Sequence, residues 1–198
     1  MAAHRTRYSS VAILLHWLIA ALIFTNIWYG WRMGAAKGLA QFELFQLHKS
    51  IGVTVLLLSL ARLGWRLVSP PPAPPAAMSG AVRLAAGAAH GLLYGLMIML
   101  PLTGWVVVSA SPYNLPTLLF KTVPWPHIGL VHDLPMMTRK LIEDQVGSVH
   151  AWLAWSLLAL AAFHIAAALK HHLLDRDDVL ARMLPLLRRS ASSAPVEI

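Results

Sequence analysis

The chain has 198 residues, of which 58% are hydrophobic and only 12% are charged. Soluble domains carry about 25% charged residues, so this composition indicates a single membrane domain, residues 1–198, whose main solvent is lipid. The absence of cysteine excludes disulfides, thiolate-held iron–sulfur clusters and covalent cofactor attachment through a C-x-x-C-H motif. The formal charge of +8 does not indicate nucleic acid binding, because the basic residues flank apolar segments instead of forming a stripe with interleaved aromatics.

Four apolar segments, at about residues 9–31, 45–67, 84–109 and 146–169, are the predicted membrane spans. A spanning helix needs about 20 predominantly apolar residues. The first segment has no charged residue and closes on an aromatic cluster, which is typical of a membrane interface. A signal peptide has an apolar core of only about 7 to 15 residues, so a span explains this segment better.

The second and third segments each contain an irregularity. Only Ser50 to Ala61 is uncharged between Lys49 and Arg62, so the second segment spans only if its cations reach the interface or meet anionic groups. Pro101 lies inside the third segment and predicts a kink there.

Three connections and a tail complete the chain. We expect a small exposed loop at Arg32 to Phe42 and an extended proline-rich linker at Ser69 to Pro75. Residues 110–145 contain five prolines and predict a long loop that covers the membrane surface. Residues 170–198 predict a polar, basic tail on the cytoplasmic side.

The distribution of Lys and Arg predicts the orientation. Ten of the 16 lie on the side that holds both termini, and six lie on the opposite side. Because cytoplasmic loops carry an excess of Lys and Arg, both termini are predicted to be cytoplasmic.

Four histidines in these segments form two pairs at matched depths. In the predicted topology, His48 opens the second span and His150 opens the fourth, both at the outer side. His16 on the first span and His164 near the end of the fourth both lie toward the inner side. The spacing of His150 and His164, at about 100° and 1.5 Å per residue, places them on nearly one helix face, roughly 21 Å apart.

Histidines from two facing helices are the ligand set of a bis-histidine haem, which also needs room for a flat macrocycle. Small residues at neighbouring turns supply that room: Gly52, Gly147, Ala154, Ala161 and Ala168. A histidine inside a membrane span is costly and therefore a functional candidate. The sequence thus predicts iron ligation by His48 with His150 at the outer level and by His16 with His164 at the inner level.

Other interpretations stay open. Zinc usually takes four clustered ligands, which two separated pairs do not offer. A histidine relay that transports a proton or a metal ion is the competing class of function. His90 lies at the inner level of the third segment and is a candidate ligand, a quinone or propionate contact, or a hydrogen-bonded core residue.

Short motifs in nearly every segment resemble the bacterial cytochrome b561 family, which is related to the cytochrome b subunits of hydrogenases and formate dehydrogenases. The matching residues are Arg7-Tyr8, Leu15-His16-Trp17-Leu18, Leu47-His48, His90 ahead of Pro101-Leu-Thr-Gly104, His150 and His164. The closing His171-His172 with Asp175, followed by Leu180-Ala-Arg182-Met183-Leu184-Pro185, resembles the small stand-alone members.

The resemblance implies an all-α, four-helix bundle in the bacterial inner membrane that holds two b haems. It assigns the inner haem to the first and fourth helices and the outer haem to the second and fourth. Some small members are superoxide oxidases that pass the electron to ubiquinone, which makes superoxide the expected outer donor and ubiquinone the expected acceptor. Larger relatives take electrons from a soluble hydrogenase or dehydrogenase partner, and this is the alternative.

Polar residues near the proposed haems are expected to contact the substrates or the haem edges. We expect His90 and His171 to serve the quinone on the inner side, with Arg83 nearby. Lys49 and Arg83 are candidate contacts of haem propionates or quinone. On the outer side, acidic residues offset most of the basic charge, so steering of an anionic donor is modest.

Overall fold

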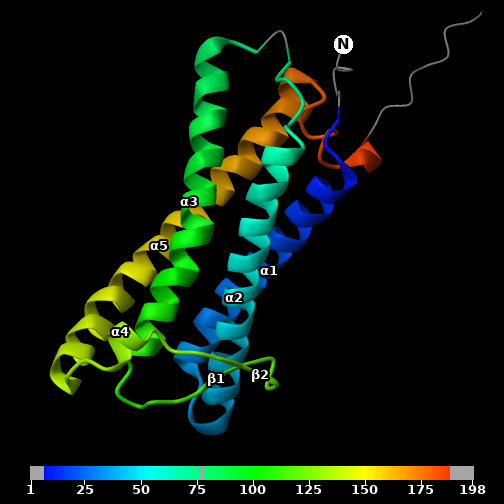
Figure 1. Ribbon diagram of the computed structural model, residues 1–198. Coiled ribbons are helices and arrows are strands. Elements are labelled where there is room, and N and C mark those ends of the chain that lie inside the picture. Colours follow the sequence, from blue (N-terminus) through cyan, green and yellow to red (C-terminus); the bar gives the residue numbers. More distant parts are fainter. Residues whose placement is uncertain (1–6, 76–77, 188–198) are drawn as a thin grey trace, which may run out of the picture.

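The computed structural model describes residues 7–75 and 78–187 and is almost entirely helical (Figure 1). Four long helices form the bundle: α1 (Ser10–Ala35), α2 (Gly38–Val68), α3 (Gly80–Ala110) and α5 (Met136–Lys170). All four are long and apolar enough to cross a membrane. Each predicted span overlaps one of these helices, and the chain is a multi-pass membrane protein.

The helices pack as two pairs. The backbone of α1 lies against α2 and that of α3 against α5, while α2 also contacts α3. One small cluster of buried side chains joins all four helices: Ile19, Ile51, Val55, Met97 and Leu157. Large apolar side chains such as Trp152 and Phe163, each 74% exposed, cover the outside of the bundle. Lipid can cover these side chains, and so the helices need little burial against one another.

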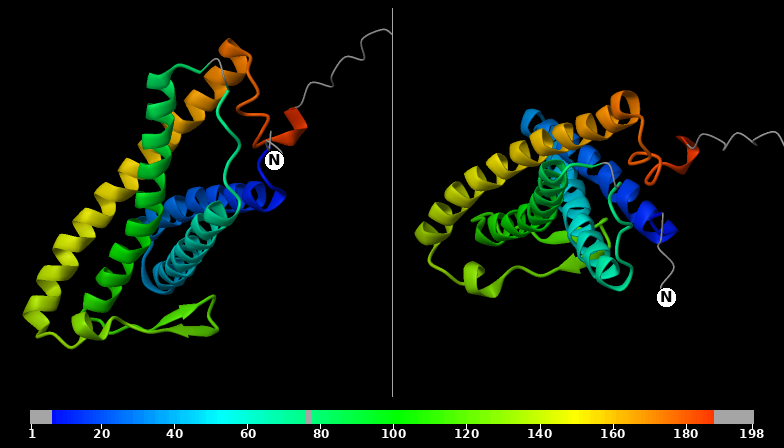
Figure 2. Two further views of the ribbon diagram at one scale, coloured as in Figure 1. Left: turned by 45° about the horizontal axis from the view of Figure 1, so that its top comes forward. Right: turned by 90° about the horizontal axis from the view of Figure 1, so that it is seen from above.

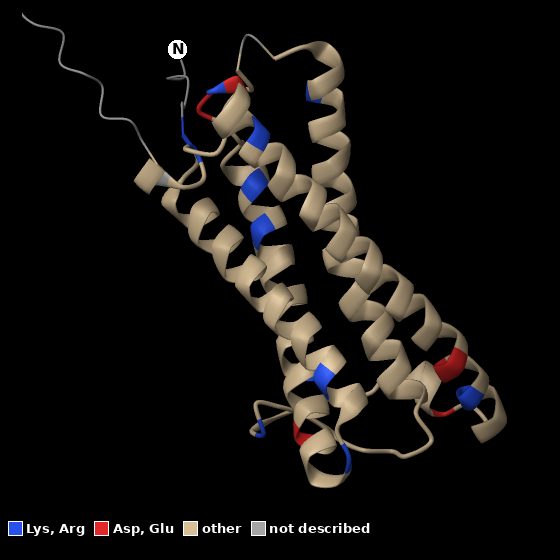
Figure 3. Cartoon of the chain, turned by 180° about the vertical axis from the view of Figure 1, so that it is seen from behind, with Lys and Arg blue, Asp and Glu red and all other residues tan. Residues whose placement is uncertain are grey.

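The charged residues lie toward the two ends of the bundle, and its middle is free of them (Figure 3). This distribution suits a bilayer, because charge at mid-membrane depth is costly. The first and last described residues lie at the same end of the bundle (Figure 1). An even number of spans requires this arrangement.

Local sequence accounts for the helix starts. Ser9 precedes α1 and its hydroxyl accepts a bond from the backbone N–H of Ala12, and Ser79 does the same for Val82 at α3. Both are N-caps, which satisfy one of the free amides of the first turn. Between α1 and α2 only residues 36 and 37 are non-helical, and Gly38 has a φ of 61°.

The expected loop from Arg32 to Phe42 was therefore wrong in extent. Both helices continue beyond their apolar stretches. Hydropathy identifies only the part of a helix that lies in lipid, and a helix can extend further at either end. The second span, by contrast, is one continuous helix despite its cations, as predicted. The proline-rich linker is non-helical over its whole length, also as predicted, and α3 runs on through Pro101.

The expected long loop at residues 110–145 needs correction. It holds a two-stranded antiparallel hairpin, β1 (Thr117–Leu119) and β2 (Val123–Trp125), and a short helix, α4 (Gly129–His132). The fourth long helix then begins at Met136, directly after Pro135, instead of near residue 146. Its first turns are polar and extend outside the apolar stretch. The left view in Figure 2 shows the hairpin and α4 together at one end of the bundle.

Buried polar side chains of α2 anchor this hairpin. The Gln46 amide donates to the Pro116 carbonyl at 2.8 Å and accepts from the Leu118 N–H at 3.3 Å. The Ser50 hydroxyl, fully buried, accepts from the Phe120 N–H at 2.9 Å. An exposed ion pair between Lys121 and Glu43 at 3.0 Å adds little to the stability of this contact. The hairpin is therefore a fixed part of the fold.

At the opposite end, the chain after α5 turns back onto the bundle. A single π-helical turn, η1 (His171–Asp175), leads to a segment that closes with the 3₁₀ turn η2 (Pro185–Leu187). The Trp17 indole of α1 donates to the Met183 carbonyl at 2.9 Å. The described part of the predicted tail is thus docked on the helices. The start of the predicted leader and the end of the tail, residues 1–6 and 188–198, lie outside the described residues.

Candidate functional site

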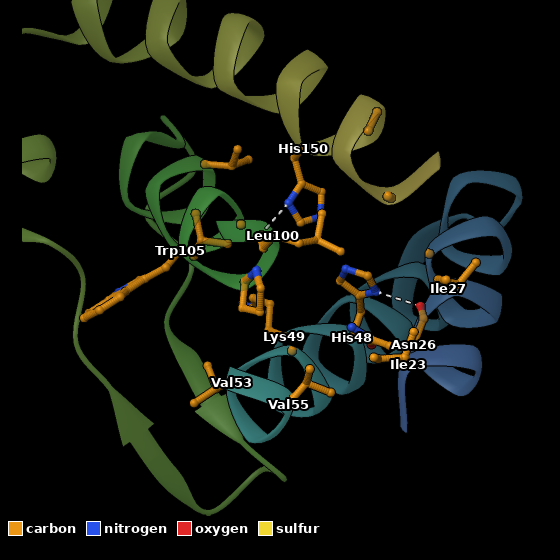
Figure 4. Close-up of a pocket in the computed structure, with 18 of the residues that line it drawn as sticks. Ile23, Asn26, Ile27, His48, Lys49, Val53, Val55, Leu100, Trp105 and His150 are labelled. Atoms are coloured by element: carbon orange, nitrogen blue, oxygen red, sulfur yellow. Dashed lines mark hydrogen bonds between the residues drawn. The ribbon is translucent and has the colours of Figure 1, made fainter. Parts of the chain in front are cut away.

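One pair of histidines lies at the hairpin end of the bundle. The ring centroids of His48 on α2 and His150 on α5 are 6.2 Å apart, with the ring planes at 74°. Both line a cavity of about 400 Å³ between the two helix pairs, shown in Figure 4. The sequence predicts that these two histidines lie at the same depth, and in the structure their rings lie close together.

The hydrogen bonds of this pair fix how each ring faces the cavity. Nδ1 of His48 lies 3.1 Å from the Asn26 carbonyl of α1, and Nδ1 of His150 lies 3.0 Å from the Leu100 carbonyl of α3 (Figure 4). A carbonyl oxygen only accepts, so each Nδ1 carries the ring proton. Nε2 of each neutral ring then keeps its lone pair, which is the arrangement typical of metal-binding histidines.

The cavity wall is mostly apolar and has two polar groups beside the histidines. Lys49 lines the cavity, and its ammonium donates a long bond, 3.4 Å, to the Pro116 carbonyl. The side-chain oxygen of Asn26 is buried and has no hydrogen-bond partner among the described residues. The cavity thus suits a large apolar group that brings polar or anionic atoms at its edge.

Glycines let the helices approach this cavity closely. A Cβ added at Gly104 would lie 3.1 Å from Cε1 of His150, and one added at Gly30 would lie 3.5 Å from Cε1 of His48. Gly52 and Gly147, both predicted from the sequence to make room, also line the cavity.

The second pair lies toward the other end. His16 on α1 and His164 on α5 have ring centroids 6.2 Å apart, with the planes at 70°. His90 on α3 joins them, with its ring centroid 5.2 Å from that of His164. Its Nδ1 lies 2.6 Å from the Ala86 carbonyl. The inner level thus holds three histidines from three helices.

At His16 the hydrogen-bond partner of Nδ1 differs from those of the outer histidines. The Arg62 guanidinium lies 2.8 Å from Nδ1 of His16 and also stacks over the Tyr94 ring at 5.9 Å. A guanidinium has only donors, so Nδ1 of His16 is the acceptor here. The ring proton of neutral His16 is then on Nε2, the reverse of the outer histidines.

The remaining predicted site residues are spread over the inner end. Arg83 is exposed near the start of α3 and donates to the Met78 carbonyl at 3.2 Å. His171 lies in the π-helical turn, with its Nδ1 2.6 Å from Asp177 and 3.2 Å from Asp175. Within residues 7–75 and 78–187, His90, Arg83 and His171 make no direct contact with one another. The structure therefore does not join them into a single site.

The loop that follows the hairpin carries two further histidines. The rings of His127 and His132 are 4.8 Å apart. Burial, helped by the nearby His132, lowers the pKa of His127, so this ring is neutral at pH 7. Neither residue lines the cavity.

Sequence reasoning missed the residues that hold the histidines: Asn26, Gly30, Arg62, Leu100, Thr103 and Gly104. Every residue has a backbone carbonyl, so the sequence does not indicate that those of Asn26 and Leu100 bond the histidines. Glycine inside a helix costs about 1 kcal/mol relative to alanine. Gly30 and Gly104 within apolar helices were therefore a signal of close approach that could have been used.

Comparison with known proteins gives a consistent result. The family model described as prokaryotic cytochrome b561 matches residues 7–186. Cytochrome b561 homolog 2 of Escherichia coli K12 is 32% identical over 189 residues, covering 90% of this chain and 91% of the relative. A protein named probable superoxide oxidase CybB, from Yersinia pestis, is 28% identical, and the match covers 92% of this chain and 98% of that relative. Cytochrome b562 of Cereibacter sphaeroides is 26% identical, and the match covers 89% of this chain and 94% of that relative.

Proposed function

Because this chain belongs to the prokaryotic cytochrome b561 family, we propose that it passes single electrons from superoxide on the outer side to a membrane quinone through two b haems. The family establishes the coarser statement, a bacterial membrane cytochrome b that transfers electrons. The observation that carries the proposal is the equal spacing of two histidine pairs at two levels of one bundle, 6.2 Å between ring centroids in each.

The outer residues fit a haem. A bond between a metal ion and an imidazole nitrogen is about 2 Å long, so two imidazoles that held one metal ion between them would have ring centroids roughly 6 Å apart. His48 and His150 meet this spacing, and their Nδ1 contacts leave both Nε2 atoms free to bind. Lys49 supplies a cation for a propionate, and the apolar walls suit the macrocycle.

The inner residues fit with one adjustment. His16 and His164 have the same spacing, but Nδ1 of His16 accepts from Arg62. For His16 to bind iron through Nε2, the guanidinium has to leave Nδ1, and a propionate would offer it a new partner. Haem held by two histidines supplies one-electron oxidation and reduction.

The proposed orientation puts the hairpin outside and both termini in the cytoplasm. The excess of basic residues at the terminal end supports this assignment. On the outer side Lys49 faces the cavity of His48 and His150, which favours a small anionic donor. Superoxide is such a donor, and the name of the Yersinia pestis relative supports it.

On the inner side we assign the quinone to the region of His90, Arg83 and His171. Nδ1 of His171 lies 2.6 Å from Oδ2 of Asp177, which fixes the orientation of the imidazole. Replacing His171 by alanine should slow quinone reduction while both haems stay bound. Loss of a haem from this variant would contradict a quinone role.

The proposal is tested with purified protein that contains bound ubiquinone. Haem quantification and a reduced-minus-oxidised spectrum should give two b haems per chain, and added superoxide should reduce the quinone. Absence of haem after expression with haem supply would refute the proposal and favour a histidine-relay transporter. Two haems with slow superoxide oxidation, together with a copurifying soluble dehydrogenase, would favour the membrane-subunit alternative.

A further inference from the structure

The two outer histidines are held by the same backbone arrangement on two different helices. His48 bonds the carbonyl of Asn26, and Gly30 follows four residues later on α1. His150 bonds the carbonyl of Leu100, and Gly104 follows four residues later on α3. Each ring therefore rests on a carbonyl and on the glycine one turn further along.

Helix geometry explains this four-residue spacing. In an α-helix the carbonyl of one residue points at the N–H of the residue four positions later. A histidine ring that bonds the second lone pair of that carbonyl lies over the residue four positions later. A side chain on that residue would contact the ring. At Gly104 an added Cβ would come within 3.1 Å of the His150 ring, which is too close without movement, whereas the 3.5 Å at Gly30 is an ordinary contact. Of the two glycines, only Gly104 lies so close that an added Cβ would push on the histidine ring.

Thr103 makes the α3 arrangement different in a second way. Its hydroxyl donates to the Leu100 carbonyl at 2.7 Å, which leaves its oxygen free to accept from Nδ1 of His150 at 3.1 Å. The matching position on α1, three residues after Asn26, is Tyr29. No bond between Tyr29 and His48 occurs among the described residues. His150 thus has two acceptors for one N–H, and His48 has one.

We infer that Thr103 is a positioning residue for His150, and that it and Gly104 set the orientation and donor strength of this imidazole as a ligand. This inference rests on the proposed function. An imidazole whose N–H is bonded to more acceptors is a more basic ligand. A more basic ligand favours oxidised iron, so Thr103 lowers the midpoint potential of the outer haem.

The hydroxyl is tested with Thr103→Val, which keeps the shape of the side chain, against Thr103→Ser, which keeps the hydroxyl. Both variants should retain two haems. Thr103→Val should raise the outer midpoint potential in a redox titration and leave the inner one unchanged, and Thr103→Ser should match the wild type. Equal potentials in wild type and Thr103→Val, or equal shifts in both variants, would overturn the inference.

The glycine is tested by comparing Gly104→Ala with Gly95→Ala. Gly95 lies in the same helix, and a Cβ added there would have no atom of a neighbouring residue within 4 Å. Gly104→Ala should change the low-spin electron paramagnetic resonance signal of the outer haem, or lose that haem, and Gly95→Ala should do neither. Identical signals in both variants would overturn the role of Gly104. Absence of haem from the wild type would refute the proposed function instead, so the two failures are distinguishable.

Discussion

Individual side chains give the two histidine levels different surroundings, although the ring spacings are equal. The outer rings donate from Nδ1 to carbonyls, while Nδ1 of His16 faces the cation of Arg62. Depth along the sequence predicted which histidines lie at the same level, but at the level of His164 the ring of His90 is closer than that of His16. It could not predict their Nδ1 contacts, because these depend on carbonyls and on an arginine 46 positions away.

Arg62 should raise the potential of the inner haem, because a nearby positive charge stabilises the reduced form. Coulomb's law with an effective dielectric constant of about 20 gives an effect on the order of 100 mV for a unit charge roughly 7 Å from the iron. Arg62→Gln should therefore lower the inner midpoint potential by that amount and leave the outer one unchanged, as measured by redox titration.

Arg176→Gln is the matched control, since Arg176 is exposed beyond the π-helical turn. It should leave both potentials unchanged. An inner potential that does not respond to Arg62→Gln would place this cation away from the inner haem.

Among the helices, α5 contributes one histidine to each level and is the shared wall of both proposed sites. Hydropathy located its apolar part but missed its polar first turns, from Met136 onward. The hairpin was also missed, because the strands are only three residues long and their anchors, Gln46 and Ser50, belong to a distant helix. Local sequence patterns do not report such contacts.

The register of α5 can be tested by inserting one alanine after Leu158, between His150 and His164. The insertion rotates one histidine relative to the other by about 100°. One haem per chain should be lost, as measured by haem quantification. An alanine inserted after Glu143 keeps the spacing of the two histidines and should retain both haems, whereas two haems in the Leu158 insertion would contradict a shared wall.

The anchoring of the hairpin can be tested with Gln46→Leu. This change removes the hydrogen bonds of Gln46 to the Pro116 carbonyl and the Leu118 N–H, and leaves the carbonyl only the long Lys49 bond, at a cost of roughly 1–3 kcal/mol. Amide hydrogen exchange over residues 117–125 should become faster by about tenfold or more. Gln41→Leu is the control, because the Gln41 side chain bonds the Met33 carbonyl at 3.2 Å and does not contact the hairpin among the residues that the structure describes. Equal exchange in both variants would contradict the anchor.

The whole molecule combines a lipid-covered exterior with a few polar contacts inside. Composition and the four apolar segments were sufficient to predict a four-span membrane bundle, since lipid as the solvent leaves few alternatives. The paired packing of α1 with α2 and of α3 with α5, which leaves the cavity between the pairs, required the structure. The proposed function rests on this arrangement, because each histidine level draws on both helix pairs.

Haem content of the wild type and of the four single variants His16→Ala, His48→Ala, His150→Ala and His164→Ala tests this arrangement most directly. The wild type should bind two haems per chain and each variant one. His48→Ala and His150→Ala should retain the same haem, with identical spectra and potentials, and His16→Ala and His164→Ala should retain the other. Retention of different haems by His48→Ala and His150→Ala would contradict the pairing.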